Sequence, residues 1–259
     1  MSMFSRWGVG ASILMYHSIA DDSDEPYTVS INDFRQQISW LHENGFEVIS
    51  LSSLLKLIQL EDHQSLQKKV VITFDDGFKD FATNALPILL DHGAPATVFL
   101  VTDLFGEKAA WNKNGADVRL MTEDEVRYIK EKGVSLGSHT ASHVNIALED
   151  REGMKRQLKE SLDVLTRLGE TFYAFAYPWG QWSVQAIDEI KSSGYECALV
   201  VGEQTRLNAE NRYLLPRVSM TSKTNLKKFQ SLLNRTNIEK ELRRKYRTLR
   251  EKKLSTTGG

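Results

Sequence analysis

The chain has 259 residues, of which 41% are hydrophobic and 26% are charged, the composition of an ordinary soluble globular protein. The single cysteine, Cys197, excludes a disulfide framework and a cysteine-rich zinc site. The net charge of −1 argues against nucleic acid as the main partner. This total hides an asymmetry, because residues 221–259 hold 12 Lys or Arg against 3 Asp or Glu.

The N-terminal segment carries two overlapping patterns. Residues 7–16 follow Arg6 and loosely resemble a short signal peptide, but they lack a convincing cleavage site. They also run directly into residues 12–16, whose apolar pattern is typical of a core strand. No apolar run approaches the roughly 18 residues that a membrane span needs. We therefore expect a cytoplasmic protein, with a secreted or cell-envelope location as the alternative if a signal was trimmed.

From this strand onward, strand-like and helix-like segments alternate along the chain. Strands are expected at residues 12–16, 46–49, 69–74, 96–101, 134–138, 172–177, 196–201 and 213–218. Helices are expected from Ser30 to Gly45, over 51–60 and 80–91, from Thr122 to near Gly133, over 151–168, and from Ser183 to Gly194. The alternation predicts an α/β fold built on a mainly parallel sheet or barrel.

Local signals refine these elements. Thr122 and Glu125 have the spacing of a capping box, which opens a helix. Pro87 falls inside the helix expected at 80–91 and predicts a kink or an irregular turn. Residues 102–120 are expected to form a long loop.

The C-terminal end differs from the body. We expect a body over residues 1–220 and a basic, partly helical extension over residues 221–259. The extension either contacts an anionic surface, such as membrane headgroups or an acidic partner, or docks on the acidic body as a solvated helix.

Reactive side chains fall just after, or near, the ends of predicted strands. They are His17, Asp75, Asp76, His139, the segment 177–180 and Arg217. In parallel β/α folds the active site is built at the carboxyl edge of the strands. We therefore expect these side chains to share one edge of the sheet.

Asp75 and Asp76 are adjacent carboxylates followed by Gly77. Adjacent side chains at a strand end point in different directions, so one carboxylate can bind a metal while the other acts as a base. Gly77 allows the backbone to turn sharply beneath them. The alternative interpretation is an ordinary strand-to-helix turn with an aspartate N-cap.

His139 and His143 are four residues apart, a spacing that lets two imidazoles on a helical turn converge on a metal. A coincidental pair at the surface or in the core is the alternative interpretation. Together with an aspartate, the two histidines have the composition of a catalytic zinc-like site with open positions.

Aromatic residues are dense between Phe172 and Trp182. Most of them are expected to be ordinary core. Trp179 and Trp182 flank Gly180 beyond a proline, so some ring surface should be exposed beside the polar site. Exposed rings in such a position suit sugar binding.

Three motifs together resemble the polysaccharide deacetylase family, the NodB homology domain of carbohydrate esterase family 4. They are TFDDG at 73–77, HTASH at 139–143 and FAYPWG at 175–180. The segments LMYHSI at 14–19 and LPRV at 215–218 resemble the subgroup of poly-N-acetylglucosamine deacetylases. The resemblance covers roughly residues 10–220 and implies a deformed (β/α) barrel with fewer than eight strands.

The resemblance also implies residue roles. Asp75 would be the catalytic base, and the ligands of Zn²⁺, or of another divalent ion such as Co²⁺ or Ni²⁺, would be Asp76, His139 and His143. The implied reaction removes an acetyl group from N-acetylated sugars. The residues expected to contact the sugar are Tyr177, Pro178, Trp179 and Trp111.

The chain departs from the family pattern at two places. The arginine usual two residues before the proline of the third motif is replaced by Ala176, and the usual Leu-x-His near the C-terminus is absent. The subgroup resemblance suggests Arg217 for the missing arginine and His17 for the missing catalytic acid.

In the mechanism we expect, Asp75 takes the proton of the attacking water, the backbone N–H of Trp179 helps hold the oxyanion, and His17 protonates the leaving amine. One alternative is hydrolysis of an O-acetyl ester or a small cyclic amide at the same site. A second is a non-catalytic carbohydrate-binding protein.

Overall fold

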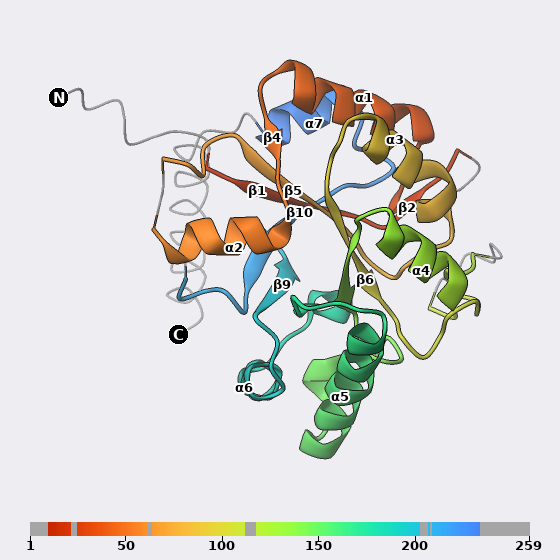
Figure 1. The fold of residues 1–259 in the computed structure, drawn as a ribbon, viewed down its shortest axis with the longest axis vertical. Coiled ribbons are helices and arrows are strands. Elements are labelled where there is room, and N and C mark those ends of the chain that lie inside the picture. Colours follow the sequence, from red (N-terminus) through yellow and green to blue (C-terminus); the bar gives the residue numbers. More distant parts are fainter. Residues whose placement is uncertain are drawn as a thin grey trace, which may run out of the picture.

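The computed structural model describes residues 10–21, 25–61, 64–111, 118–202, 207 and 209–233. Its centre is a closed barrel of parallel strands (Figure 1). The strands, in barrel order, are β1 (Ser12–Tyr16), β5 (Lys69–Phe74), β6 (Ala96–Leu100), β7 (Ser135–Ser138), β8 (Ala174–Ala176), β9 (Cys197–Val201) and β10 (Leu215–Ser219). The barrel closes because β1 pairs with both β5 and β10, so that Leu14 lies opposite Ile72 and Val218.

Three short strands lie outside this ring. β4 (Glu47–Val48) pairs with the start of β5, and β2 (Ser18–Ile19) pairs with β3 (Thr28–Val29) in a separate small sheet. The ring therefore has seven strands, which confirms the prediction of a deformed barrel with fewer than eight.

Helices surround the barrel. They are α1 (Ile31–Glu43), α2 (Leu51–Gln59), α3 (Leu86–Asp91), α4 (Glu123–Glu131), α5 (Arg151–Arg167), α6 (Val184–Ser192) and α7 (Leu226–Leu233). α1, α3 and α7 cover one flank, whereas α5 and α6 pack together on another (Figure 1). Within the described part of the chain, no helix is both long and apolar enough to cross a membrane.

Side-chain caps explain where several helices begin. Ser30 accepts a hydrogen bond from the Asp33 N–H at 3.0 Å, and α1 starts at the next residue. Thr122 and Glu125 form the reciprocal bonds of the predicted capping box at the start of α4.

The helix expected over 80–91 is divided in two, as Pro87 indicated. Its first part is a π-helical turn, η1 (Phe81–Ala85), and α3 follows with Pro87 in its first turn. Proline is tolerated there because its missing N–H needs no partner. The strand expected over 172–177 is shorter than predicted, because only Ala174–Ala176 pair with β9.

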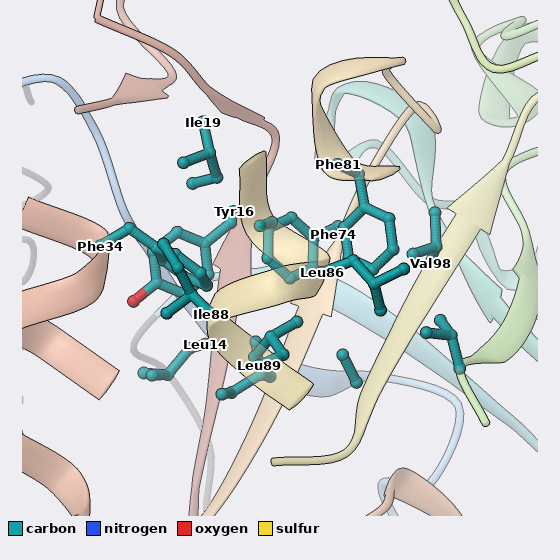
Figure 2. Packing of buried hydrophobic residues seen from close by; sticks show 14 of the residues in the cluster. Leu14, Tyr16, Ile19, Phe34, Phe74, Phe81, Leu86, Ile88, Leu89 and Val98 are labelled. Carbon is teal, nitrogen blue, oxygen red and sulfur yellow. The ribbon is translucent and has the colours of Figure 1, made fainter. Parts of the chain in front are cut away.

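The largest apolar cluster fills the space between the barrel and the α1–α3–α7 flank (Figure 2). Tyr16 of β1 stacks on Phe74 of β5 at 5.4 Å between ring centroids, and Phe74 meets Phe81 of η1 at 4.8 Å. This row of rings joins two barrel strands to the turn that follows β5, so it holds the carboxyl end of β5 firmly.

The predicted C-terminal extension is described only up to Leu233. Its helix α7 lies against α1, with Phe229 and Leu233 buried in the same apolar cluster. Gln37 of α1 also donates to the Thr224 carbonyl at 2.7 Å. The remainder of the extension, and the signal-like residues before Gly10, lie outside the described residues.

Candidate active site

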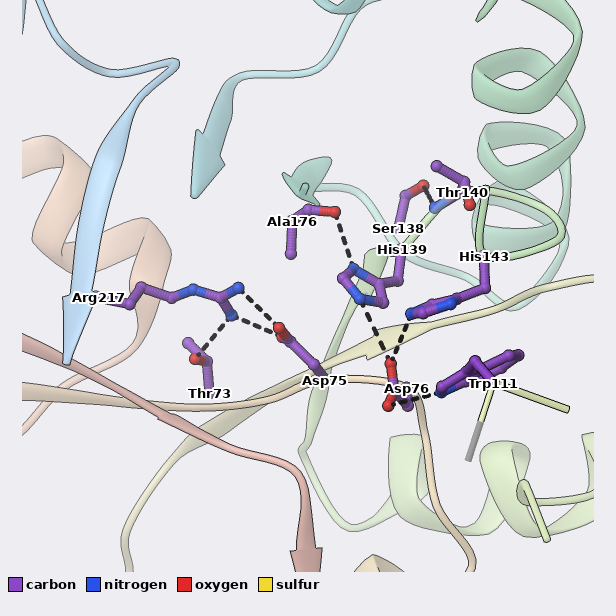
Figure 3. Close-up of polar contacts among 10 residues, drawn as sticks. All are labelled: Thr73, Asp75, Asp76, Trp111, Ser138, His139, Thr140, His143, Ala176 and Arg217. Atoms are coloured by element: carbon purple, nitrogen blue, oxygen red, sulfur yellow. Dashed lines mark hydrogen bonds and ion pairs between the residues drawn. The ribbon is translucent and has the colours of Figure 1, made fainter. Parts of the chain in front are cut away.

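The carboxyl edge of the barrel gathers the side chains that the sequence predicted there. Asp75 and Asp76 follow β5, His139 follows β7, and Arg217 reaches inward from β10 (Figure 3). Because all seven strands are parallel, their carboxyl ends open on the same edge. Asp75 and Arg217, which are 142 positions apart in the chain, are thereby brought into contact.

Asp76 faces both predicted histidines through a single oxygen. Its Oδ1 lies 3.3 Å from Nε2 of His139 and 3.2 Å from Nε2 of His143 (Figure 3). The three side chains are buried, and their potential ligand atoms all lie within 4.8 Å of one another. His139 Nδ1 lies 2.8 Å from the Ala176 carbonyl, to which it donates, so its Nε2 carries the free lone pair.

These residues fit a divalent metal ion. Asp76 Oδ1 is buried with no hydrogen-bond partner, although two imidazole nitrogens face it. Lone pairs aimed at a carboxylate oxygen are unfavourable unless a cation lies between them. A tetrahedral zinc site with bonds of about 2.0–2.1 Å places its ligand atoms about 3.3 Å apart, which matches the two Asp76–histidine separations. In the described part of the chain, this is the one group with such an arrangement.

The ionisation of the three groups suits this role. Burial works to raise the pKa of Asp76, but the close imidazoles of His139 and His143 hold it well below its usual value. Burial works to lower the pKa of His139, but the charges of Asp75 and Asp76 outweigh it and raise the pKa. Burial lowers the pKa of His143. Asp76 is therefore a carboxylate across the whole neutral range.

Asp75 makes a bidentate ion pair with Arg217 in the barrel interior. Arg217 Nη1 donates to Oδ1 at 2.6 Å, and Nη2 donates to Oδ2 at 2.7 Å. The guanidinium also donates to Thr73 Oγ1 at 3.3 Å and lies over the Phe99 ring at 5.5 Å. Burial works to raise the pKa of Asp75, but the Arg217 charge holds that pKa below its usual value. The pair keeps Asp75 ionised and fixes its orientation.

His17 follows β1 at the same edge. The Asp75 N–H donates to the Tyr16 carbonyl at 3.0 Å, which ties the residue before His17 to the aspartate pair. His17 Nδ1 is buried without a hydrogen-bond partner, and the ring packs on Tyr27 at 4.7 Å between centroids. Burial lowers the pKa of His17, although the charges of Asp76 and Asp75 oppose that effect.

Backbone strain is concentrated in this site. Six described residues other than glycine have a positive φ, and four of them lie here: Asp76 at 70°, Thr140 at 63°, His143 at 58° and Trp179 at 60°. L-residues adopt this conformation at a cost, and it persists only where the surrounding structure imposes it. The Asp-Asp-Gly, histidine and proline motifs each contribute at least one strained residue.

Two tryptophans border the predicted metal ligands. Trp111 stacks on His143 with 3.9 Å between ring centroids, and its Nε1–H donates to Asp76 Oδ2 at 3.2 Å. Trp179 makes an edge contact with the His143 ring at 4.9 Å between centroids and leaves 56% of its surface exposed. Trp111 thus supports the ligands directly, a contact that the sequence did not predict. Trp179, together with the exposed Trp182, has the open ring surface that was expected.

The position of Tyr177 corrects one prediction. Its ring is buried against Phe175, and its hydroxyl donates to the Tyr213 carbonyl at 3.1 Å. Pro178 is buried as well. The Tyr177 ring therefore has no surface for a sugar, because the side chain of this residue points into the cluster between the barrel and α5–α6.

One side chain that holds the histidine loop was not predicted from the sequence. Gln157 of α5 is buried, and its Oε1 accepts hydrogen bonds from the N–H groups of Ala141 at 2.9 Å and Ser142 at 3.0 Å. Its Nε2 donates to Ser142 Oγ at 2.8 Å. A signal was present in the sequence, because Gln157 is a polar residue on the apolar face of an amphipathic helix.

These features define a buried, metal-competent hydrolytic site at the open edge of a β/α barrel. Residues 62–198, more than half of the chain, match the polysaccharide deacetylase family, and the chain belongs to that family.

Two relatives illustrate the likeness in sequence. The putative polysaccharide deacetylase YxkH of Bacillus subtilis is 25% identical over 81% of this chain and 71% of its own length. The poly-β-1,6-N-acetyl-D-glucosamine N-deacetylase of Escherichia coli K12 is 26% identical over 85% of this chain, but this region makes up only 38% of that protein.

A solved structure gives the same picture of the fold. The deacetylase PplD of Streptococcus pyogenes, solved in complex with acetate, superposes with a TM-score of 0.75 at 23% identity. The superposition covers 88% of this chain and all of that one. The recognition of the family and of its fold from the motifs is therefore confirmed.

Proposed function

We propose that this protein is a metal-dependent deacetylase that hydrolyses the acetyl amide of N-acetylated sugars within a poly-N-acetylglucosamine-type glycan. The observation that carries the proposal is the convergence of Asp76, His139 and His143 beside the ion-paired Asp75. Family membership and the relatives named as N-deacetylases of such a glycan support the same substrate class.

Asp76, His139 and His143 would hold the metal, for which Zn²⁺ is our first choice and Co²⁺ or Ni²⁺ the alternatives. A bound ion of this kind polarises the acetyl carbonyl and lowers the pKa of a bound water. Because His139 donates from Nδ1 to the Ala176 carbonyl, its Nε2 is oriented and unprotonated for this task.

Asp75 acts as the general base in this proposal. Its carboxylate receives the proton of the attacking water, and Arg217 keeps it ionised and correctly oriented before that transfer. A base with a lowered pKa is weak towards bulk water, so it suits a water that is already acidified. Arg217 thus makes Asp75 a weaker base, but keeps it in the ionised form that can accept a proton.

The remaining two roles fall to Trp179 and His17. The backbone N–H of Trp179 stabilises the oxyanion of the tetrahedral intermediate, and the strained φ of 60° fixes the direction of that peptide. His17 then donates a proton to the amine nitrogen, because an amide anion is too basic to leave unprotonated. Its partly buried ring is positioned beside the charges of Asp75 and Asp76.

The test is acetate release by the full chain from a panel of N-acetylated and O-acetylated sugars of increasing length. We expect release from N-acetylated oligomers that chelator abolishes and Zn²⁺ restores, with one ion per chain in the active form. Full activity in a metal-free preparation would contradict the proposal. Preferential release from O-acetyl esters would instead favour the esterase alternative, which the comparisons do not favour.

A further inference from the structure

In the described part of the chain, no hydrogen bond fixes the His17 side chain through Nδ1. Its ring packs on Tyr27, which is 46% exposed. A general acid must nevertheless lie within hydrogen-bond reach of the leaving nitrogen. The backbone that carries His17 must therefore supply the precision that its side-chain contacts do not.

The two residues after His17 form hydrogen bonds with polar side chains of the turn that follows β5. Ser18 Oγ donates to Asp80 Oδ2 at 2.6 Å, and the Ile19 N–H donates to Asp80 Oδ1 at 3.3 Å. Asn84 Nδ2 donates to the carbonyl of the same Ile19 at 2.8 Å. Asp80 and Asn84 thus satisfy the backbone of β2 as a neighbouring strand would.

This clamp lies close in sequence to the aspartate pair. Asp80 lies four residues after Asp76 and immediately precedes the π-helical turn η1, whose five residues lead up to α3. π-Helical turns occur frequently at functional sites. Figure 2 shows Ile19 in the same apolar cluster as the rings of Tyr16, Phe74 and Phe81.

A carboxylate is a costly choice for a purely structural clamp. Burial raises the pKa of Asp80 to about 6, although the bonds from Ser18 and Ile19 oppose that effect. The described residues place no lysine or arginine in an ion pair with it, so its charge is met by hydrogen bonds alone. A buried carboxylate is tolerated where the positions of the residues that it holds are more important than its cost to the stability of the fold.

We propose that Asp80 is a positioning residue for the deacetylation. It fixes the backbone of Ser18 and Ile19 and thereby sets the place of His17 relative to Asp75 and Asp76. The proposal rests on the proposed function, in which His17 is the acid. It predicts that loss of Asp80 slows the step that needs the proton of His17 and leaves metal binding unchanged.

The first measurement uses Asp80→Ala and Asp80→Asn in the full, metal-loaded chain. For acetate release from an N-acetylglucosamine oligomer, Asp80→Ala should lower kcat by about 10²-fold, the cost of roughly 1 Å of misplacement, with little change in KM. Hydrolysis of 4-nitrophenyl acetate should fall much less, because nitrophenolate leaves without a proton. Asp80→Asn should recover part of the amide rate, since its amide can still accept from Ile19 and donate to Ser18.

Glu170→Gln is the matched control. Glu170 is a buried carboxylate that accepts from Lys130 Nζ at 2.6 Å and from the Leu136 N–H at 2.8 Å, near the start of β7 and away from His17. If Asp80 acted only through the stability of the fold, Asp80→Ala and Glu170→Gln would each lower amide and ester hydrolysis in parallel. We expect the ratio of amide to ester turnover to fall for Asp80→Ala and to stay unchanged for Glu170→Gln.

A second readout does not depend on activity. The imidazole C–H resonances of His17, assigned with His17→Ala, should shift in Asp80→Ala and remain in place in Glu170→Gln. An unchanged His17 resonance, or equal losses on amide and ester, would overturn the positioning role. If the wild-type chain releases no acetate from any substrate, the proposed function fails, and the resonance comparison alone decides whether Asp80 positions His17.

Discussion

Replacing Arg217 by methionine tests the electrostatic logic of the site. The side chains of Arg217 and Asp75 are 0% and 3% exposed, so solvent screens their bidentate pair very little. Removing one partner of a buried pair leaves an uncompensated charge and costs about 3–5 kcal/mol. We expect Arg217→Met to lower the free energy of unfolding by that amount at neutral pH.

The same variant should change how stability depends on pH. In the wild-type chain the pKa of Asp75 is lowered by Arg217, so the pair stabilises the fold above the ordinary carboxylate pKa and loses this effect as pH falls. Without the arginine, the pKa of Asp75 rises, because burial is then opposed only by the charges of His139 and His17. The stability deficit of Arg217→Met should therefore be largest at neutral pH and shrink on acidification.

The assay is urea unfolding followed by tryptophan fluorescence, in chelator so that metal binding does not contribute. Measurements at neutral pH and about two units lower give the pH dependence. The double variant Asp75→Asn with Arg217→Met removes both charges and should be more stable than Arg217→Met alone. A single-variant loss below about 1 kcal/mol, the size of an exposed pair, with no pH dependence would refute the argument.

Three further predictions address the other roles. Asp75→Asn should keep one metal per chain but lose about 10²–10⁴-fold in turnover, whereas Asp76→Ala should lose the metal; swapped phenotypes would reverse the two assignments. His17→Ala should retain the metal and lower amide hydrolysis much more than hydrolysis of an activated ester, and equal losses on both substrates would exclude the acid role. Gln157→Leu should weaken metal affinity by about 10–100-fold, because the loop between the two histidines loses its support. The conservative variant Gln157→Glu keeps the hydrogen-bond acceptor for that loop. Unchanged metal affinity in Gln157→Leu would contradict this explanation.

Most of the fold followed from local patterns. The apolar run at 69–74, the serine before α1 and the threonine of the capping box each produced the element they indicated. The strand expected at 213–218 is instead Leu215–Ser219, because its bounds are set by the residues of β9 and β1 with which it pairs. Pro87 predicted irregularity, but not the π-helical turn before it, whose Phe81 packs against Phe74 of β5.

The type of site could be predicted from the sequence. Reactive residues follow the ends of parallel strands, and this rule places His17, Asp75 and His139 at one edge of the barrel. The direction in which each side chain points could not be predicted. Tyr177 lies in the right motif but turns into the core, whereas Trp111, within a long loop, turns onto Asp76 and His143. Which way a ring points depends on contacts between segments distant in sequence, and periodicity carries no information about those.

Arg217 illustrates how far such cross-barrel contacts extend. Its guanidinium rests on the Phe99 ring, and that ring fits because Gly137 of β7 has no side chain: an added Cβ would lie 2.5 Å from two of the Phe99 ring carbons. Exchange of Gly137 for alanine would thus displace the Phe99 ring on which Arg217, the partner of Asp75, rests. The packing around the ion pair of the proposed base thus extends to a glycine 62 positions after Asp75, on a strand that does not pair with β5.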